Sequence, residues 1–191
     1  MKKTDFQIYE NKILFSFINK IQHNEVISKD ILESYFNTTK EYFAETGLDC
    51  EKYIFAIFMQ NYLINIRDNG VFNEKNLLTH IELFSEINPL ITFEDTKLFY
   101  HTAQLYSVFE GPVEMLQDKF DELYGVYQVA PVDVSIMLKY WTQNALLKIL
   151  EKIPTYNPMA ALQIIEDMEV TVFEFNQIKS LLKGVGETLW H

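Results

Sequence analysis

The chain has 191 residues, of which 48% are hydrophobic and 15% aromatic, so it can bury a sizeable core and is not a disordered tail. With 16 basic and 27 acidic residues its net charge is −11, which argues against direct binding to nucleic acid unless basic residues gather on one face. No such cluster is visible in the sequence. One cysteine excludes an internal disulfide, and no apolar run reaches the roughly 18 residues of a membrane span. We therefore expect a cytoplasmic protein that does not bind a membrane.

The negative charge is concentrated in the middle of the chain. Residues 1–48 carry about −1, residues 49–131 about −8 and residues 132–191 about −2. The acidity is therefore concentrated on the first two predicted repeat units.

Residues 1–48 predict two amphipathic helices. Phe6, Leu14 and Phe17 lie at helical spacing in the first helix, and Leu32 and Phe36 do so in the second. Gly47 is expected to end the second helix. We expect this pair to cap one end of a larger helical body.

Four further helices are predicted between residues 49 and 131, because glycine, proline and asparagine interrupt otherwise periodic apolar segments. One helix should run from residue 49 to Gly70, and another should begin at Asn73 and end before Asn88. Residues 92–127 read as two helices joined at Gly111 and Pro112, which suit a helix end and a helix start.

The C-terminal part predicts three more helices, for a total of eight or nine. One follows Pro131, a second begins at Pro158, and Thr171 with Glu174 forms a capping box for a third that ends at Gly184. No segment alternates apolar and polar residues as a half-buried strand would.

Stop signals and similar segments recur at a spacing near 40 residues. Gly70 and Gly111 are 41 residues apart, and LFYHT at 98–102 is echoed by LKYWT at 138–142. This period indicates an all-α protein of helical hairpins stacked as an irregular repeat, with a compact helical bundle as the alternative. We expect one globular domain. In it, residues 1–48 would cap the stack, residues 49–183 would form the repeat body, and residues 184–191 would form a C-terminal tail.

No motif in the sequence indicates catalysis, a cofactor or a metal. The four histidines lack partners at metal-ligand spacing, and no nucleophile elbow, phosphate-binding loop or dinucleotide fingerprint occurs. We therefore predict no catalytic residues, no cofactor and no metal site.

Amides, threonines and tyrosines recur within otherwise apolar helices and could line a groove. An amide offers a donor and an acceptor to a peptide backbone, and tyrosine adds amphipathic contact area. The predicted groove residues are Asn61, Tyr62, Tyr100, Thr102, Gln104, Tyr140, Gln143 and Asn144. The alternative is that these side chains satisfy neighbouring helices or face water.

In layout, the helix pairs across residues 49–183 resemble the degenerate tetratricopeptide-like repeats of peptide-sensing regulators of Gram-positive bacteria. The resemblance implies a concave helical surface. The chain departs from that pattern in its longer period, in its unmatched glycine, alanine and tryptophan positions and in lacking a preceding helix-turn-helix domain, so membership does not follow.

These patterns favour a non-enzymatic helical module, a regulator or adaptor from a bacterium or phage, that binds a protein or peptide. The alternative is an acidic inhibitor or immunity protein that occludes a basic partner, such as a nucleic-acid-binding protein. Its predicted partner face comprises Glu114, Asp118, Asp121 and Glu122. An enzyme without a recognisable motif is the third hypothesis, and homo-oligomerisation is left open.

Overall fold

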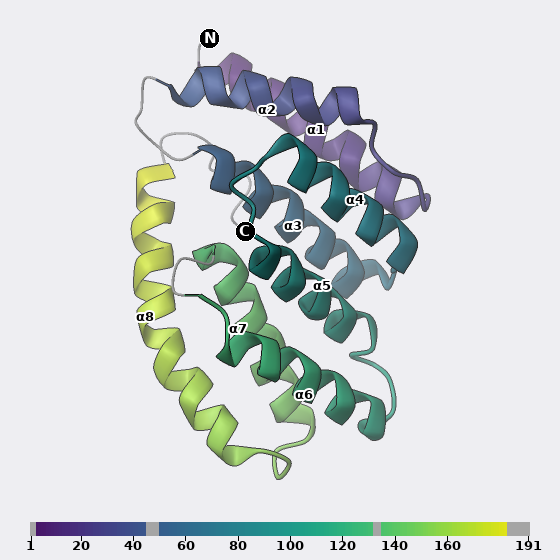
Figure 1. Cartoon of the computed structure of the whole chain (residues 1–191), viewed down its shortest axis with the longest axis vertical. Helices are drawn as coiled ribbons and strands as arrows, with labels where there is room; N and C mark the ends of the chain where they lie inside the picture. Colours follow the sequence, from purple (N-terminus) through teal and green to yellow (C-terminus); the bar gives the residue numbers. More distant parts are fainter. Residues whose placement is uncertain (1–2, 45–49, 132–134, 183–191) are drawn as a thin grey trace. The chain divides into compact units, whose positions relative to one another are not determined.

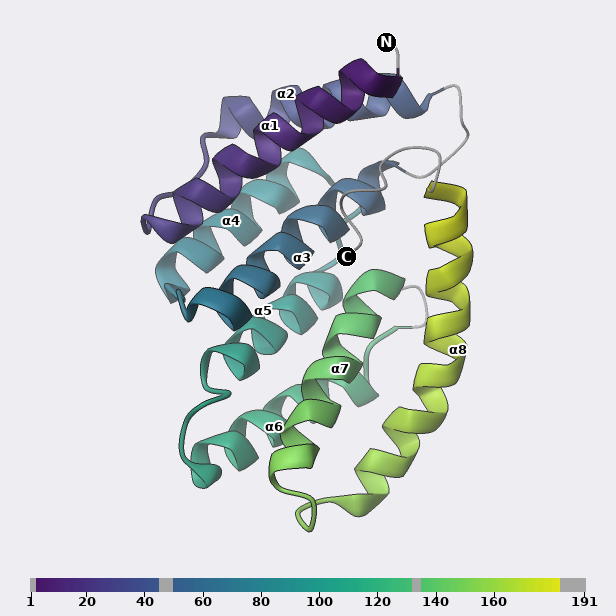
Figure 2. The ribbon, with the colours of Figure 1, turned by 180° about the vertical axis from the view of Figure 1, so that it is seen from behind.

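A computed structural model describes residues 3–44, 50–131 and 135–182, and these residues form eight helices (Figures 1 and 2). The helices are α1 (Lys3–Gln22), α2 (Lys29–Phe43), α3 (Cys50–Asn69), α4 (Glu74–Ile87), α5 (Phe93–Ser107), α6 (Val113–Gln128), α7 (Ile136–Lys152) and α8 (Pro158–Leu182). No strand occurs among the described residues, and the all-α prediction is confirmed.

Several helix ends lie at the predicted signals. Gly70 has φ +64° and its N–H donates to the Ile66 carbonyl at 2.9 Å, so it ends α3 in a conformation that glycine adopts without strain. The Asn73 side chain caps α4 by accepting from the Asn76 N–H at 3.1 Å. The predicted ends at Gly47 and Gly184, and the residues directly after Pro131, lie outside the described parts of the chain.

The C-terminal prediction of two helices is wrong, because α8 is one helix of 25 residues. Thr171, which we expected to cap a new helix, lies inside α8 and is 1% exposed. Its hydroxyl donates to the Asp167 carbonyl one turn earlier, at 3.1 Å. A buried threonine can use this backward bond instead of a cap, and neither glycine nor proline interrupts residues 159–183.

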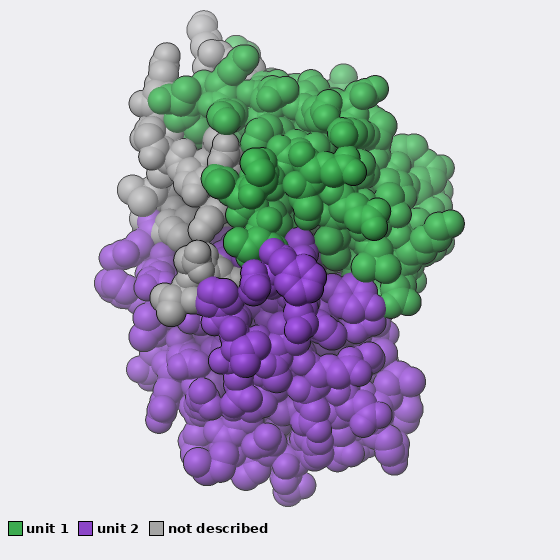
Figure 3. All heavy atoms as spheres, viewed as in Figure 1, with its two compact units in different colours: residues 1–92, 182–191 green, residues 93–181 purple. Residues whose placement is uncertain are grey.

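The chain divides into two compact units after Thr92 (Figure 3). Unit 1 contains α1 to α4, and unit 2, residues 93–181, contains α5, α6, α7 and all of α8 except its last residue, Leu182. The boundary falls inside the segment 49–183 that we expected to form one repeat body. The arrangement of cap, body and tail stays a prediction.

The core of unit 1 is rich in aromatic rings. Phe17 meets Phe58 edge to face with centroids 4.6 Å apart, and Tyr35 meets the same Phe58 at 5.4 Å. The Tyr35 hydroxyl also donates to the buried Glu10 carboxylate at 2.5 Å. Because Phe17 belongs to α1, Tyr35 to α2 and Phe58 to α3, this cluster joins the three helices. Edge-to-face contacts between rings add to the stabilisation that burial alone provides.

In unit 2, side chains 40 residues apart in the sequence contact one another. The Asp95 carboxylate accepts from the Ser135 N–H at 3.1 Å, and the buried hydroxyls of Thr102 and Thr142 lie 2.9 Å apart. The Tyr127 hydroxyl donates to Asp167 at 2.8 Å. These contacts hold α5 beside α7 and α6 beside α8, so the sequence period reappears as a packing register in this unit. A repeat through the whole chain stays a prediction.

Candidate functional site

Three of the predicted groove residues are buried. Tyr62 is 2% exposed and its ring packs against those of Phe17 and His80, with centroids 6.2 and 5.7 Å away. Thr102 faces Thr142, and the Gln143 amide donates to the Tyr127 hydroxyl at 2.8 Å. In this conformation these side chains join helices and are covered from solvent.

The other five predicted groove residues are partly exposed. The amides of Asn61 and Asn144 donate, at 2.8 Å each, to the carbonyls of Ile57 and Tyr140 in their own helices. The Tyr140 ring stacks on Phe175 at 4.7 Å. Asn61 belongs to unit 1 and Asn144 to unit 2, and a shared groove stays a prediction.

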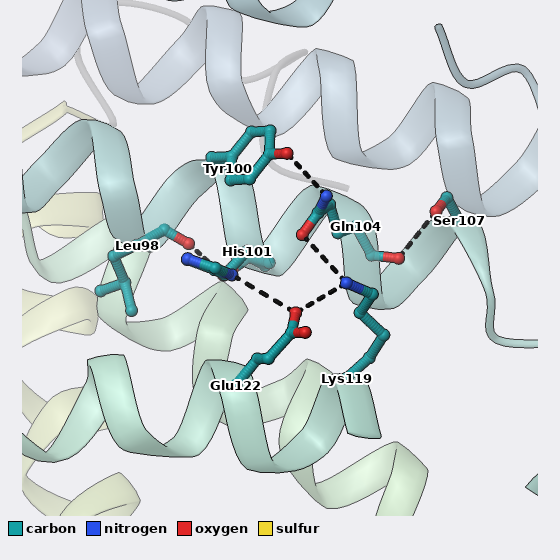
Figure 4. A network of polar contacts seen from close by, with 8 residues as sticks. Leu98, Tyr100, His101, Gln104, Ser107, Lys119 and Glu122 are labelled. Atoms are coloured by element: carbon teal, nitrogen blue, oxygen red, sulfur yellow. Dashed lines mark hydrogen bonds and ion pairs between the residues drawn. The ribbon is translucent and has the colours of Figure 1, made fainter. Parts of the chain in front are cut away.

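The remaining two, Tyr100 and Gln104, belong to a polar network between α5 and α6 (Figure 4). The Gln104 amide donates to the Tyr100 hydroxyl at 2.7 Å, and Lys119 donates to Glu122 at 2.6 Å. His101 Nδ1 lies 3.9 Å from the Glu122 carboxylate. Burial lowers the pKa of His101, and the Glu122 charge opposes that effect. The Lys119 ammonium also donates to the Gln104 side-chain oxygen at 3.5 Å, and this hydrogen bond ties the two helices together.

The predicted acidic face of α6 is only partly free. Asp121 accepts a hydrogen bond from the Tyr156 hydroxyl at 2.6 Å, and Glu122 is held by Lys119. Glu114 and Asp118 are exposed. Two of the four carboxylates thus already have partners within unit 2.

A small pocket of about 160 Å³ opens in unit 2. Its polar lining comes mainly from Tyr127, Lys139, Gln163 and Asp167. Burial, helped by Asp167 and opposed by the hydrogen bond from Gln143, raises the pKa of Tyr127, so this hydroxyl stays a neutral donor to Asp167. Because its tyrosine and carboxylate already bond to each other, the pocket offers few unpaired groups for chemistry.

Among the described residues, no three histidine, cysteine, aspartate or glutamate side chains are grouped as a metal site would require. Within the same residues, no helix is long and apolar enough to cross a membrane.

The feature that sequence reasoning missed is the outward side of α8. Ala160, Ile164 and Thr171 point into unit 2 and are buried. Leu162 and Phe173, on the opposite side, are 58% and 64% exposed. We call this side the α8 outer face, and define it by the exposed residues Met159, Leu162, Ile165, Glu166, Glu169, Val170 and Phe173.

One signal in the sequence could have revealed this face. The segment after Pro158 has apolar residues on every side of a helix and no stop before Gly184. A helix with apolar residues on every side is usually buried. Among the described residues, Gln163 and Asp167 of α8 bond to α6 and Phe175 stacks on Tyr140 of α7, and apolar side chains such as Leu162 and Phe173 stay exposed. The placement of a boundary at Thr171 hid the pattern, because it divided the face between two supposed helices.

Comparisons with protein-family models, with curated proteins and with solved structures found no match to this chain.

Proposed function

We propose that this protein is a non-enzymatic helical module, a regulator or adaptor, that binds a protein or peptide through the α8 outer face. The observation that carries the proposal is the exposure of five large apolar side chains on one helix. The exposed fractions are Met159 72%, Leu162 58%, Ile165 49%, Val170 60% and Phe173 64%.

One physical argument supports this proposal. A large group of exposed apolar side chains on a soluble protein is most often a site where a partner binds. The interior polar groups, by contrast, are used to join helices, as the Gln143 bond to Tyr127 illustrates.

The acidic-inhibitor hypothesis stays a prediction that concerns α6, and it is tested separately below. A cytoplasmic location also stays a proposal, supported by the lone Cys50.

Site-specific photocrosslinking tests the proposed function. A benzophenone side chain at Leu162 should crosslink a partner in extract of the source cells, and the same group at Phe15 should not. Phe15 is a suitable control because it is an apolar residue of unit 1 that is 75% exposed. The captured partner, once purified, should bind the unmodified chain and should lose at least about tenfold in affinity to a Leu162→Ser, Phe173→Ser variant. Equal affinity for both chains would refute the proposal.

A further inference from the structure

The centre of the α8 outer face combines two apolar side chains with two acidic ones in a regular order. Leu162, Glu166, Glu169 and Phe173 are separated by four, three and four residues, which keeps them on one side of a helix. All four are exposed. The face therefore presents an apolar end, an acidic centre and a second apolar end, over about 16 Å of helix.

No basic side chain neutralises this acidic centre from within the same segment. Lys152 precedes α8 and the next basic residue is Lys179, so residues 158–177 carry only acidic charge. Of the four acidic residues there, Asp167 turns inward to the Tyr127 hydroxyl. Glu166 and Glu169 face solvent, and no ion pair joins either of them to another described residue.

This charge excludes several ways of covering the face. Anionic lipid surfaces and nucleic-acid backbones would both be repelled by paired glutamates. A second copy packed antiparallel about a two-fold axis would place Leu162 against the second copy's Phe173, which is favourable. The same register would place Glu166 against the second copy's Glu169, and like charges brought together at an interface are costly.

Resting on the protein-binding function proposed above, we propose that the α8 outer face binds an amphipathic helix of a partner protein whose apolar contact residues flank lysines or arginines. Such a helix packs its apolar anchors on Leu162 and Phe173, and its basic side chains pair with Glu166 and Glu169. Apolar burial supplies the affinity of this complex, and the charge pairs decide which amphipathic helices are accepted.

Two designed helical peptides test this proposal with the full-length chain. Both are 18 residues long with leucines at the same positions, and the other positions carry lysine in one peptide and glutamate in the other. Fluorescence anisotropy of the labelled peptides gives their affinities at 0.05 and 0.5 M salt. We expect the leucine–lysine peptide to bind, with affinity falling at high salt, and the leucine–glutamate peptide to bind at least about tenfold more weakly.

Matched variants separate the α8 outer face from the overall negative charge. Leu162→Ser with Phe173→Ser should weaken the leucine–lysine peptide at least about tenfold, and Glu166→Gln with Glu169→Gln should remove most of its salt dependence. The controls are Ile8→Ser with Phe15→Ser, exposed apolar residues of α1, and Glu114→Gln with Asp118→Gln, exposed acids of α6. Neither control should change the affinity by more than about twofold.

The outcomes separate the two proposals. If the α6 control weakens the peptide as much as the α8 glutamate variant, binding follows net charge and the inference is overturned. If both peptides bind equally well and both need Leu162 and Phe173, the basic partner class is wrong and the protein-binding function stands. If neither peptide binds, the inference fails, whereas the photocrosslinking experiment still decides the proposed function.

Discussion

Gly111 and Gly125 lie close together in the sequence, but their surroundings are opposite. A Cβ on Gly111 would lie 2.9 Å from the Val108 carbonyl oxygen, whereas a Cβ on Gly125 would meet nothing within 4 Å. We expect Gly111→Ala to lower the free energy of unfolding by about 1 kcal/mol or more, because backbone has to shift. Gly125→Ala, inside α6, should raise it by about 0.5–1 kcal/mol, because glycine is a poor helix former.

Urea unfolding followed by circular dichroism measures both changes. If Gly111→Ala and Gly125→Ala changed the free energy of unfolding in the same direction, the close contact between position 111 and the Val108 carbonyl would be contradicted. The sequence predicted that Gly111 ends the preceding helix, but α5 ends at Ser107, and Gly111 lies in the turn before α6, where its N–H donates to the Val108 carbonyl at 2.7 Å. Gly111 does not have a positive φ, and its constraint is the close contact with the Val108 carbonyl oxygen.

His80 is fully buried in the core of unit 1, where its Nε2 accepts from the Ile27 N–H at 3.2 Å. Burial, opposed by a smaller effect of the Asn76 backbone, lowers the pKa of His80 to about 4. Between about pH 4 and 6.5 the unfolded chain therefore binds a proton that the folded chain does not. The contribution of the neutral His80 side chain to the free energy of unfolding is fully present above pH 6.5. It falls by up to about 3 kcal/mol as the pH drops to 4.

The comparison of wild type with His80→Gln isolates this effect, because glutamine keeps an acceptor for the Ile27 N–H but does not titrate. The stability difference between the two proteins should shrink as the pH falls from 7 to 4. If the free energies of unfolding of wild type and His80→Gln changed with pH in parallel, the assignment of a buried, neutral His80 imidazole would be contradicted.

At the scale of elements, Tyr127 links three helices of unit 2. Its hydroxyl, on α6, accepts from Gln143 of α7 and donates to Asp167 of α8. Tyr127→Phe would leave the buried Gln143 amide without that acceptor, so we expect a loss of about 1–3 kcal/mol in the free energy of unfolding.

Tyr124→Phe is the matched control, because Tyr124 donates a more exposed bond to Gln163 of the same helix α8. Its cost should stay below about 1 kcal/mol. Equal losses for the two variants, measured by thermal unfolding, would show that burial of the Gln143 amide does not matter.

Helix α8 also shows where sequence reasoning fails at this scale. The glycine signal predicted the end of α3, and asparagine signals predicted both ends of α4, since those residues act through the local backbone. Thr171 carries the same local signal as a cap, yet its hydroxyl bonds backward within a continuous helix. Only the packing of unit 2 decides between the two uses, and a local pattern does not contain that packing.

Among the described residues, Glu114 with Asp118 on α6 and Glu166 with Glu169 on α8 are exposed acidic pairs whose importance for binding sequence patterns alone do not rank. Reversing the charge of each pair shows which of the two pairs contributes more to the rate of association with the partner. Glu166→Lys with Glu169→Lys should slow association with the photocrosslinked partner at least about tenfold at 0.05 M salt, and much less at 0.5 M, where screening shortens electrostatic steering. Glu114→Lys with Asp118→Lys should change the rate by less than about threefold.

Stopped-flow association rates give both values. If the α6 variant slowed association more than the α8 variant, the result would favour the acidic-inhibitor hypothesis over partner binding at the α8 outer face. The predicted groove offers a third contrast, because Tyr100→Ala and Asn144→Ala should leave both the rate and the affinity nearly unchanged if the partner occupies α8.

The helical class and most helix boundaries could be predicted because apolar periodicity and stop residues are local properties of the chain. The candidate site could not be found in the same way. Tyr62, Thr102 and Gln143 looked suited to a groove because they are polar groups within apolar helices, and that is also the pattern of groups that satisfy one another inside a core. Exposure of Leu162 and Phe173 depends on which side of α8 the rest of unit 2 covers, which no single segment reveals.

Along α8, the side chains of Leu162, Glu166, Glu169 and Phe173 are apolar, acidic, acidic and apolar, at spacings of four, three and four residues. This pattern is the same when the helix is followed from its other end. A bound helix with an equally symmetrical set of contact residues meets apolar, acidic, acidic and apolar groups whichever way its N-terminus points. The direction of the partner chain is then set by contacts beyond these four residues, so one surface can serve segments that run in opposite directions.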